Sequence, residues 1–343
     1  MFYQNKVHLY WLLSCCVTLL ILIIVGGLTR LTDSGLSITN WEIFTGILPP
    51  LNHQTWLDYF ELYKQIPEYK LINYNMSLSE FKIIFWWEYA HRILARLTVI
   101  LFVVPMIFFI FKKEIRYQKL ILSLGVCFLF FLQGFIGWYM VKSGLVKNVD
   151  VSHIRLAMHL FTAIIIYSLL FWLLLNYQNR YLLIKINKSN LFLIILLLAT
   201  YMQIIFGAFV SGLDAGLIYQ TWPLMNESFI ANDINFYSIF SLESLNNHSY
   251  VQFYHRILAY LIFIIFLFSY FNNCKHKYIP GKYFNYIFLA VLFQIILGIL
   301  TLLSGLNIYL ASLHQIGSIL LISTILIAIY RSSNLIDNKE LKD

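Results

Sequence analysis

Charged residues are scarce in this sequence. Lysine, arginine, aspartate and glutamate together make up 12% of its 343 residues, whereas 60% are hydrophobic. Soluble domains carry roughly 25% charged residues, which water solvates at their surface. A chain of this length with so little charge could not cover a soluble surface. The composition therefore excludes a soluble globular domain and predicts an integral membrane protein.

Cysteine is also rare, and its four residues are poorly placed for cross-links or metal binding. Cys15, Cys16 and Cys127 fall in hydrophobic runs, Cys274 falls in a loop that we expect on the cytoplasmic side, and no C-x-x-C pair occurs. Disulfides form in oxidising compartments, and thiolate metal sites need closely spaced ligands. We therefore expect neither a structural disulfide nor a cysteine-bound metal.

Long hydrophobic runs are what the sequence has in abundance. A helix needs roughly 20 predominantly apolar residues to cross a bilayer. Eight runs reach this length, at residues 9–28, 84–111, 118–141, 154–176, 189–212, 250–272, 284–304 and 309–330. Of the six prolines only Pro105 lies inside a run. The sequence thus predicts an all-α membrane protein with eight transmembrane helices, the first retained because no A-x-A-like cleavage site follows it.

The basic residues predict how the chain crosses the membrane. Cytoplasmic loops carry the excess of lysine and arginine, and with a cytoplasmic N-terminus 14 of the 24 basic residues fall on that side. These residues are Lys6, Lys112, Lys113, Arg116, Lys119, Arg180, Lys185, Lys188, Lys275, Lys277, Lys282, Arg331, Lys339 and Lys342. We therefore expect both termini to be cytoplasmic. The net charge of +8 reflects this bias rather than a surface for nucleic acid.

The chain contains an internal repeat. The pentapeptide HRILA occurs at residues 91–95 and again at 255–259, and the glycine-containing segment 26–36 resembles 207–217. The third and seventh runs correspond in the same way at Gln133, Gly137, Gln294 and Gly298. Self-similarity of this kind marks a duplicated structural unit.

Each copy of the repeat contains four runs, so the second copy enters the membrane in the same orientation as the first. The fold class that follows is two pseudo-symmetric four-helix bundles related by a parallel repeat. We place the first bundle at 1–180 with a long outer loop at 30–83, and the second at 181–343 with an outer loop at 213–249.

Two patterns in the first outer loop predict local structure. The stretch from Trp56 to Phe60 combines aromatic and aliphatic residues with Asp58, which predicts an amphipathic segment at the membrane interface. Ser77 and Glu80 have the spacing of a capping box, which predicts the start of the second long helix.

Four of the nine histidines lie at repeat-related positions near the outer ends of the even-numbered runs, namely His91, His159, His255 and His314. A single buried histidine is most often a hydrogen-bonded core residue, but polar groups at a shared depth in lipid tend to be functional. Two imidazoles facing each other across a four-helix bundle suit the axial ligation of a haem iron, whereas zinc or copper would need further ligands. His153 could compete with His159, and we expect it at the rim.

The residues beside these histidines differ between the two copies. Arg92 and Arg256 directly follow a histidine and could pair with haem propionates, although they could also reach lipid headgroups. Glu88 lies one helical turn before His91, whereas the aligned residue of the second copy is Gln252. We therefore expect one site with a carboxylate that accepts a proton, unless Glu88 only interacts with the helix dipole, and one site for electrons alone.

Three motifs point to a family. They are GGLTRLTDSGLS at 26–37, LPPL at 48–51 and FWWEYAHR at 85–92. With these motifs the sequence resembles, over essentially its whole length, the haem A synthases of proteobacteria and mitochondria. The resemblance implies two pseudo-symmetric bundles and the oxidation of the C8 methyl group of haem O to the formyl group of haem A by two successive hydroxylations, for haem A-containing terminal oxidases.

The resemblance also implies residue roles. His255 and His314 would ligate the iron of a resident haem B, while His91 and His159 would flank the iron of the substrate, haem O. Glu88 would match the carboxylate that takes part in the oxidation. Another branch of the family carries a cysteine pair in the first outer loop, and this sequence has none there, so no redox role for such a pair is expected.

The resemblance further implies the inner (cell) membrane as the location and membrane lipid as the surroundings. It also implies contact with the haem O synthase (protohaem farnesyltransferase) and a possible homo-oligomer. Two other functions fit the pattern of residues. A membrane cytochrome with two bis-histidine haems would only transfer electrons, but Glu88, which has no counterpart in the second copy, disfavours it. A haem or solute transporter would share the parallel repeat, but transporters often contain interrupted helices, which this sequence does not predict.

Overall fold

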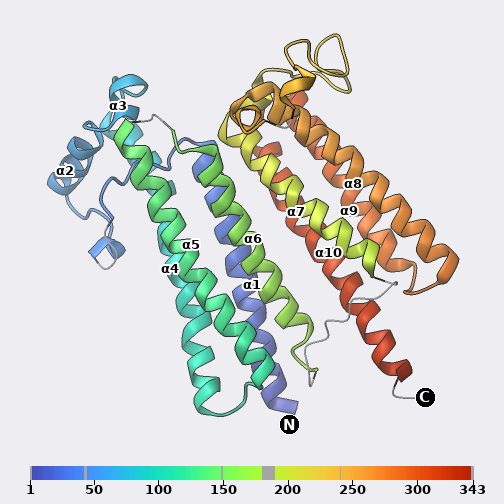
Figure 1. The fold of residues 1–343 in the computed structure, drawn as a ribbon. Coiled ribbons are helices and arrows are strands. Elements are labelled where there is room, and N and C mark those ends of the chain that lie inside the picture. Colours follow the sequence, from blue (N-terminus) through green and yellow to red (C-terminus); the bar gives the residue numbers. More distant parts are fainter. Residues whose placement is uncertain (1, 42–44, 148–149, 180–189, 240, 341–343) are drawn as a thin grey trace. The chain divides into compact units, whose positions relative to one another are not determined.

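The computed structural model describes residues 2–41, 45–147, 150–179, 190–239 and 241–340, and Figure 1 traces them as a ribbon. Within these ranges every regular element is a helix, and eight helices are long and apolar enough to cross a membrane. They are α1 (Phe2–Leu31), α4 (Leu78–Phe111), α5 (Tyr117–Lys147), α6 (His153–Leu175), α7 (Leu191–Gly212), α8 (His248–His276), α9 (Lys282–Leu303) and α10 (Ile308–Glu340). The eight predicted spans and the all-α class are thus confirmed for a multi-pass membrane protein.

Several helices are longer than the apolar runs that predict them. Helix α1 covers residues 2–31 where its run covers 9–28, and α10 covers 308–340 where its run covers 309–330. An apolar run reports only the part of a helix that lies in hydrocarbon. The backbone hydrogen bonds of a helix continue into the polar headgroup region, so the helix ends lie beyond the run.

The chain divides into two compact units, Met1–Tyr167 (unit 1) and Ser168–Asp343 (unit 2). The boundary predicted from the repeat, at residues 180–181, lies outside the described residues, as do Arg180, Lys185 and Lys188. The division falls inside α6 because the end of this helix is tied to unit 2. The hydroxyl of Tyr201 donates to Ser168 Oγ at 2.8 Å, and the amide of Asn179 donates to Tyr330 Oη at 3.0 Å.

In unit 1, α1 packs along α4, and the two helices run in opposite directions. Trp11 near the start of α1 donates from its indole nitrogen to the carbonyl of Leu101 at 3.1 Å, whereas Thr29 near the end of α1 reaches the carbonyl of Trp87 at 3.4 Å. Phe102 of α4 is fully buried and stacks on Trp11 with ring centres 5.5 Å apart.

The outer loop of unit 1 has its own small core. It contains α2 (His53–Tyr63), α3 (Pro67–Leu71) and a 3-10 turn (Thr45–Ile47), and Figure 1 shows α2 and α3 close to one end of α4. The ring centres of Trp56 and Phe85 lie 4.9 Å apart. The amphipathic segment predicted at Trp56–Phe60 is therefore part of α2, and its aromatic face packs against α4.

Helix α4 begins where the sequence predicts. Ser77 Oγ accepts from the backbone N–H of Glu80 at 3.3 Å, and Glu80 Oε2 accepts from the backbone N–H of Ser77 at 2.7 Å. This reciprocal pair is the predicted capping box, and it fixes the start of the helix that carries Glu88 and His91.

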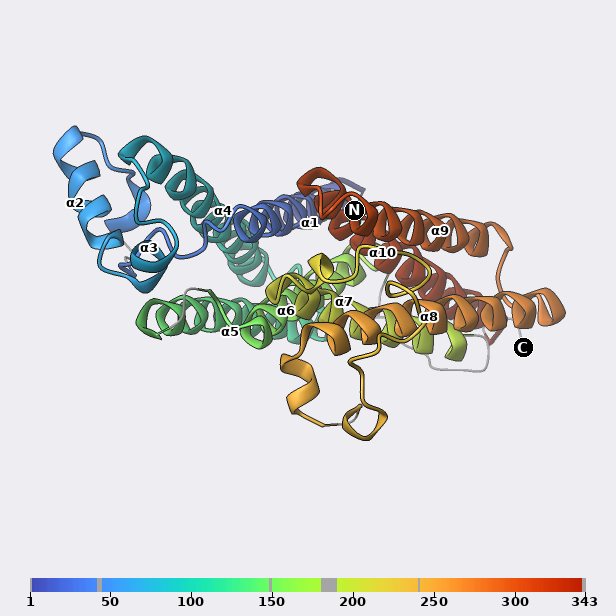
Figure 2. The ribbon, with the colours of Figure 1, turned by 90° about the horizontal axis from the view of Figure 1, so that it is seen from above.

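Unit 2 is built from pairs of neighbouring helices. Helix α7 packs along α8 and α9 along α10, which Figure 2 shows from above, and α10 also contacts α7. The outer loop of unit 2 contains short 3-10 turns at Ala215–Leu217, Phe236–Ser238 and Glu243–Asn246.

The four cysteines of the chain are free, and two of them, Cys15 and Cys16, are buried.

A buried carboxyl group lies in the outer loop of unit 1. Glu68 of α3 is 5% exposed, and the amide of Asn73 donates to Glu68 Oε1 at 3.4 Å and to Tyr63 Oη at 2.8 Å. Glu68 Oε2 is buried without a hydrogen-bond partner among the described residues. Burial raises the pKa of Glu68 to about 8, and the carboxylates of Asp33, Glu88 and Asp150 act in the same direction.

Glu68 should make the stability of this loop depend on pH. A carboxyl group whose pKa is raised in the folded state binds a proton more tightly there, so its contribution is full below about pH 4.5 and is lost as the pH rises to about 8. We expect Glu68→Gln to flatten the fall in melting temperature of the purified protein over this range. Glu61→Gln on α2, where the carboxylate is 63% exposed, serves as control, and parallel curves for wild type and Glu68→Gln would contradict the expectation.

Candidate functional site

The structure brings the four repeat-related histidines together in two pairs. In unit 1, the ring centres of His91 (α4) and His159 (α6) lie 6.4 Å apart, with an angle of 65° between the ring planes. In unit 2, the ring centres of His255 (α8) and His314 (α10) lie 6.3 Å apart at 78°. The same local geometry therefore occurs once in each unit.

Each of these four rings has an unsatisfied nitrogen. The Nδ1 atoms of His91, His159, His255 and His314 are buried and have no hydrogen-bond partner among the described residues. Burying a polar atom without a partner is unfavourable, and such atoms in a native fold commonly mark a functional role or an unseen partner. All four rings therefore have the character of binding groups rather than of satisfied core residues.

The ring spacing fits one metal ion between each pair. An imidazole nitrogen binds a metal at about 2 Å and lies about 1 Å from its own ring centre, so two imidazoles on opposite sides of one ion have centres roughly 6 Å apart. Both observed spacings match this value. In the described part of the chain, no cluster of three or more histidine, cysteine, aspartate or glutamate side chains could hold an ion alone. Paired axial ligation, as in a haem, is the arrangement that fits.

Three glutamines secure the helices that carry the histidines, and the sequence analysis did not identify them as site residues. Gln133 donates to the carbonyl of His159 at 3.0 Å, Gln203 to that of His255 at 2.9 Å and Gln294 to that of His314 at 2.9 Å. The repeat already aligned Gln133 with Gln294, which was the available signal. The position in unit 1 that corresponds to Gln203 is Leu22, whose side chain cannot donate a hydrogen bond, so the corresponding contact with the carbonyl of His91 is missing.

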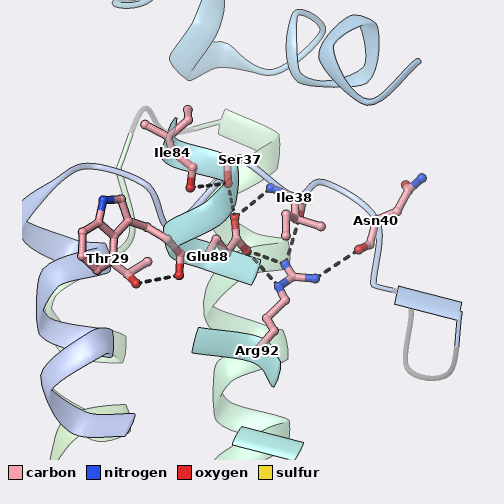
Figure 3. A network of polar contacts seen from close by, with 8 residues as sticks. Thr29, Ser37, Ile38, Asn40, Ile84, Glu88 and Arg92 are labelled. Atoms are coloured by element: carbon pink, nitrogen blue, oxygen red, sulfur yellow. Dashed lines mark hydrogen bonds and ion pairs between the residues drawn. The ribbon is translucent and has the colours of Figure 1, made fainter. Parts of the chain in front are cut away.

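Glu88 is held in a network that joins α4 to the start of the outer loop, drawn in Figure 3. Its side chain is buried, with the residue 3% exposed. Glu88 Oε2 accepts from Ser37 Oγ and from the backbone N–H of Ile38, both at 2.7 Å. Glu88 Oε1 accepts from Arg92 Nη2 at 2.6 Å and from Arg92 Nε at 3.0 Å. The carboxylate therefore accepts four hydrogen bonds, so Glu88 does more than interact with the helix dipole.

Arg92 continues the network into the loop. It donates to the carbonyls of Ile38 at 2.9 Å and Asn40 at 3.2 Å, and its guanidinium lies 5.0 Å from the ring centre of Trp41. These contacts, together with the ion pair to Glu88, engage all three guanidinium nitrogens. The pairing of Arg92 with a haem propionate therefore stays a prediction.

Unit 2 repeats the loop attachment without the carboxylate. Gln252 donates to the carbonyl of Tyr219 at 2.9 Å, and Arg256 donates to the carbonyls of Tyr219 at 2.9 Å and Leu224 at 3.1 Å. Tyr219 occupies the repeat position of Ile38. Arg256 Nε is buried without a hydrogen-bond partner among the described residues, so one donor is still available to an anionic group.

His153 does not join the paired rings. It is buried at the first residue of α6, and the ring that faces His91 is that of His159. The choice of His159 over His153 that the repeat alignment favours therefore matches the observed pairing.

Fold and site together define a multi-pass membrane protein with two repeat-related histidine pairs. The family described as cytochrome oxidase assembly protein matches residues 9–326 of the chain. Similar proteins named haem A synthase come from Pelagibacter ubique (51% identity, covering 94% of this chain and 96% of the relative) and Rickettsia bellii (44%, covering 92% and 95%). Another, from Rickettsia felis, is 42% identical and covers 94% and 97%. The chain belongs to the cytochrome oxidase assembly protein family.

The network around Glu88 predicts that Arg92 keeps the first outer loop in place. Removing one partner of a buried ion pair typically destabilises by about 3–5 kcal/mol, and both side chains are largely buried. We therefore expect Arg92→Gln to speed amide hydrogen exchange in residues 37–41 on the order of 100-fold. Arg256→Gln is the matched control and should speed exchange around Tyr219 instead. Unchanged exchange of residues 37–41 in Arg92→Gln would contradict the assignment.

Proposed function

We propose that this chain converts haem O into haem A, oxidising the C8 methyl group to a formyl group by two successive hydroxylations, for haem A-containing terminal oxidases. The observation that carries the proposal is the presence of two histidine pairs with ring centres 6.4 and 6.3 Å apart, only one of which lies beside a carboxylate. The name haem A synthase, borne by relatives that cover more than nine tenths of the chain, supports it.

We assign the two haems to the two units. His255 and His314 would ligate a resident haem B, and His91 and His159 would bind on either side of the haem O iron. The difference in side chains supports this order. Gln203 donates a hydrogen bond to the helix that bears His255. Leu22, at the corresponding position of unit 1, cannot make this contact with the helix of His91, so the helix of the unit 2 site is held by one more hydrogen bond.

Bound haem supplies the redox chemistry, and the residues of the chain supply ligation, orientation and proton handling. Glu88 is the residue that would accept the proton released when the methyl group is oxidised. Arg92 and the N–H of Ile38 hold its carboxylate in one orientation. Because four hydrogen bonds converge on this group, a proton reaches it only if at least one of them breaks.

The surroundings follow from the same proposal. An apolar substrate is best transferred within the membrane, so we propose that haem O comes directly from the haem O synthase. The basic residues where α4 ends and α5 begins, Lys112, Lys113 and Lys119, support an inner-membrane protein with cytoplasmic termini. A two-haem electron-transfer cytochrome is the second candidate, and the near-equal ring spacings favour it.

The test separates the two candidates. The chain is expressed in a host that makes haem O but no haem A, and the non-covalent haems are extracted, separated by chromatography and identified by mass. We expect haem A, or its hydroxymethyl intermediate, only when the chain is present. Unmodified haem B and haem O from a folded, haem-loaded protein would favour the electron-transfer cytochrome.

Glu88→Gln tests the proton acceptor. Loss of a general base typically slows a reaction by about 100-fold or more, so haem A formation should fall by that factor while the haem B content of the purified protein stays unchanged. Ser37→Ala is the matched control, because it removes one hydrogen bond to Glu88 and keeps the carboxylate; its effect should be much smaller. Loss of haem B in Glu88→Gln would refute the assignment of that haem to unit 2.

A further inference from the structure

Each of the four paired histidines faces a glycine on a neighbouring helix. The four pairs are Gly26 with His91, Gly137 with His159, Gly207 with His255, and Gly298 with His314. The glycines lie on α1, α5, α7 and α9, and the histidines lie on α4, α6, α8 and α10. The same pairing therefore occurs at both histidines of each unit.

The contacts leave no room for a side chain at these glycines. A Cβ atom added at Gly26 would lie 2.8 Å from Cε1 of His91, and the corresponding distances are 3.0 Å at Gly137, 3.2 Å at Gly207 and 3.0 Å at Gly298. Carbon atoms that are not bonded to each other pack at about 3.5–4.0 Å. A methyl group at any of the four positions would therefore press on the imidazole, and the ring would have to shift, by a few tenths of an ångström at Gly137, Gly207 and Gly298 and by more at Gly26.

Two other glycines in the spans face a side chain that is not an imidazole: an added Cβ atom would lie 2.5 Å from Gln294 at Gly317 and 3.1 Å from Leu36 at Gly144. An added Cβ atom would meet nothing within 4 Å at Gly125 or at Gly134, which lies in α5 one turn before Gly137. Glycine weakens a helix relative to alanine, and membrane helices usually use it where two backbones approach closely. At the four positions here the approaching group is an imidazole ring, so the contact is specific to the histidine sites.

The contact with the glycine also determines which edge of the imidazole ring faces the neighbouring helix. Nδ1 lies closer to the added Cβ than Nε2 does at Gly26 (3.2 against 3.8 Å) and at Gly137 (3.5 against 3.9 Å). At Gly207, Nδ1 lies at 3.7 Å with Nε2 beyond 4 Å, and at Gly298 the two nitrogens are equidistant at 3.6 Å. The ring edge with Nδ1 thus turns toward the glycine helix in three of the four pairs.

The main chain one turn before the glycine lies beside the ring. Leu22, Gln203 and Gln294 are each four residues before the facing glycine, and their backbone interacts with His91, His255 and His314. A histidine that binds a metal through one nitrogen usually donates its other N–H to a carbonyl or carboxylate. Without a Cβ atom at the glycine, the ring can come near enough to the helix backbone for Nδ1 to find such an acceptor.

We propose that Gly26, Gly137, Gly207 and Gly298 are positioning residues for the haem ligands, an inference that rests on the proposed function. Each glycine lets one imidazole lie against the neighbouring helix, and at Gly26, Gly137 and Gly207 the ring edge with Nδ1 faces that helix, which leaves Nε2 for iron. At His255 the amide of Gln203 lies 3.2 Å from Nε2, so iron would replace that contact. The four glycines act through the histidines and do not touch the reacting atoms.

The test uses the resident haem of unit 2 in the purified full-length protein. Gly207→Ala and Gly298→Ala are compared with Gly125→Ala and Gly134→Ala, where the new methyl group meets nothing. We expect the first two variants to lose at least half of the bound haem B or to show an altered low-spin haem spectrum and midpoint potential. The two controls should match the wild type. Full haem content with an unchanged spectrum and potential in Gly207→Ala and Gly298→Ala would overturn the proposal.

A second measurement separates a steric effect on the ring from a general packing defect. Gly298→Ala is made in the wild-type chain and in His314→Ala, and the melting temperature is measured in haem-free protein. If the methyl group acts on the imidazole, it lowers the melting temperature of the wild type and not of His314→Ala. An equal loss in both backgrounds would show that the glycine serves helix packing alone, which overturns the proposal.

The two measurements distinguish failure of this inference from failure of the proposed function. A wild-type protein that binds no haem from a haem-supplied host would refute the proposed function. The melting temperatures would still decide whether Gly298 seats His314, because that coupling needs no haem.

Discussion

A polar atom inside a bilayer must find its hydrogen-bond partner within the protein, because lipid chains offer none. Hydroxyl groups in the spans follow this rule by donating to the carbonyl one turn earlier, as Thr98 does to Leu94 at 2.7 Å and Thr200 to Leu196 at 2.8 Å. Glu88 follows it with four donors. The paired histidines differ: Nδ1 of all four is buried without a hydrogen bond within the described residues, although three of the rings interact with a neighbouring helix backbone. The protein keeps these rings in an apolar setting for a partner outside its own side chains.

Duplication explains how two such sites arose with different chemistry. In both units an arginine one residue after the first histidine attaches the outer loop, through the carbonyl of Ile38 in one and of Tyr219 in the other. The scaffold is therefore shared. Two positions differ. One turn before the first histidine lies a carboxylate at Glu88 and an amide at Gln252, and on the neighbouring helix Leu22 corresponds to Gln203.

The fold and the paired histidines could be predicted because both depend on local or periodic signals. Apolar runs report spans directly, and the repeat places His91, His159, His255 and His314 at corresponding positions. The contacts of Glu88 with Ser37 and Ile38 could not be predicted, because they join residues about 50 positions apart through an irregular loop. The aromatic face of α2 was assigned to the membrane interface, since amphipathicity alone does not say which apolar surface will cover it.

The hydrogen bonds of Ser168 with Tyr201 and of Asn179 with Tyr330, all within unit 2, have no signal in the sequence. A repeat marks which segments were copied and does not report such side-chain contacts. The glycines opposite the histidines were visible in the repeat as Gly137 and Gly298. Their role was not, because a missing side chain has meaning only once the ring that fills its place is known.

The arrangement around Glu88 has a thermodynamic consequence. Ser37, the N–H of Ile38 and Arg92 all act on one carboxylate, so the free energy that holds the loop against α4 and the free energy of protonating Glu88 are linked. Such linkage is reciprocal: displacing the loop changes the proton affinity of Glu88 by as much as protonation changes the position of the loop. The corresponding residue of unit 2 is Gln252, whose amide does not titrate, so its hydrogen bond to the loop carbonyl of Tyr219 does not carry this linkage.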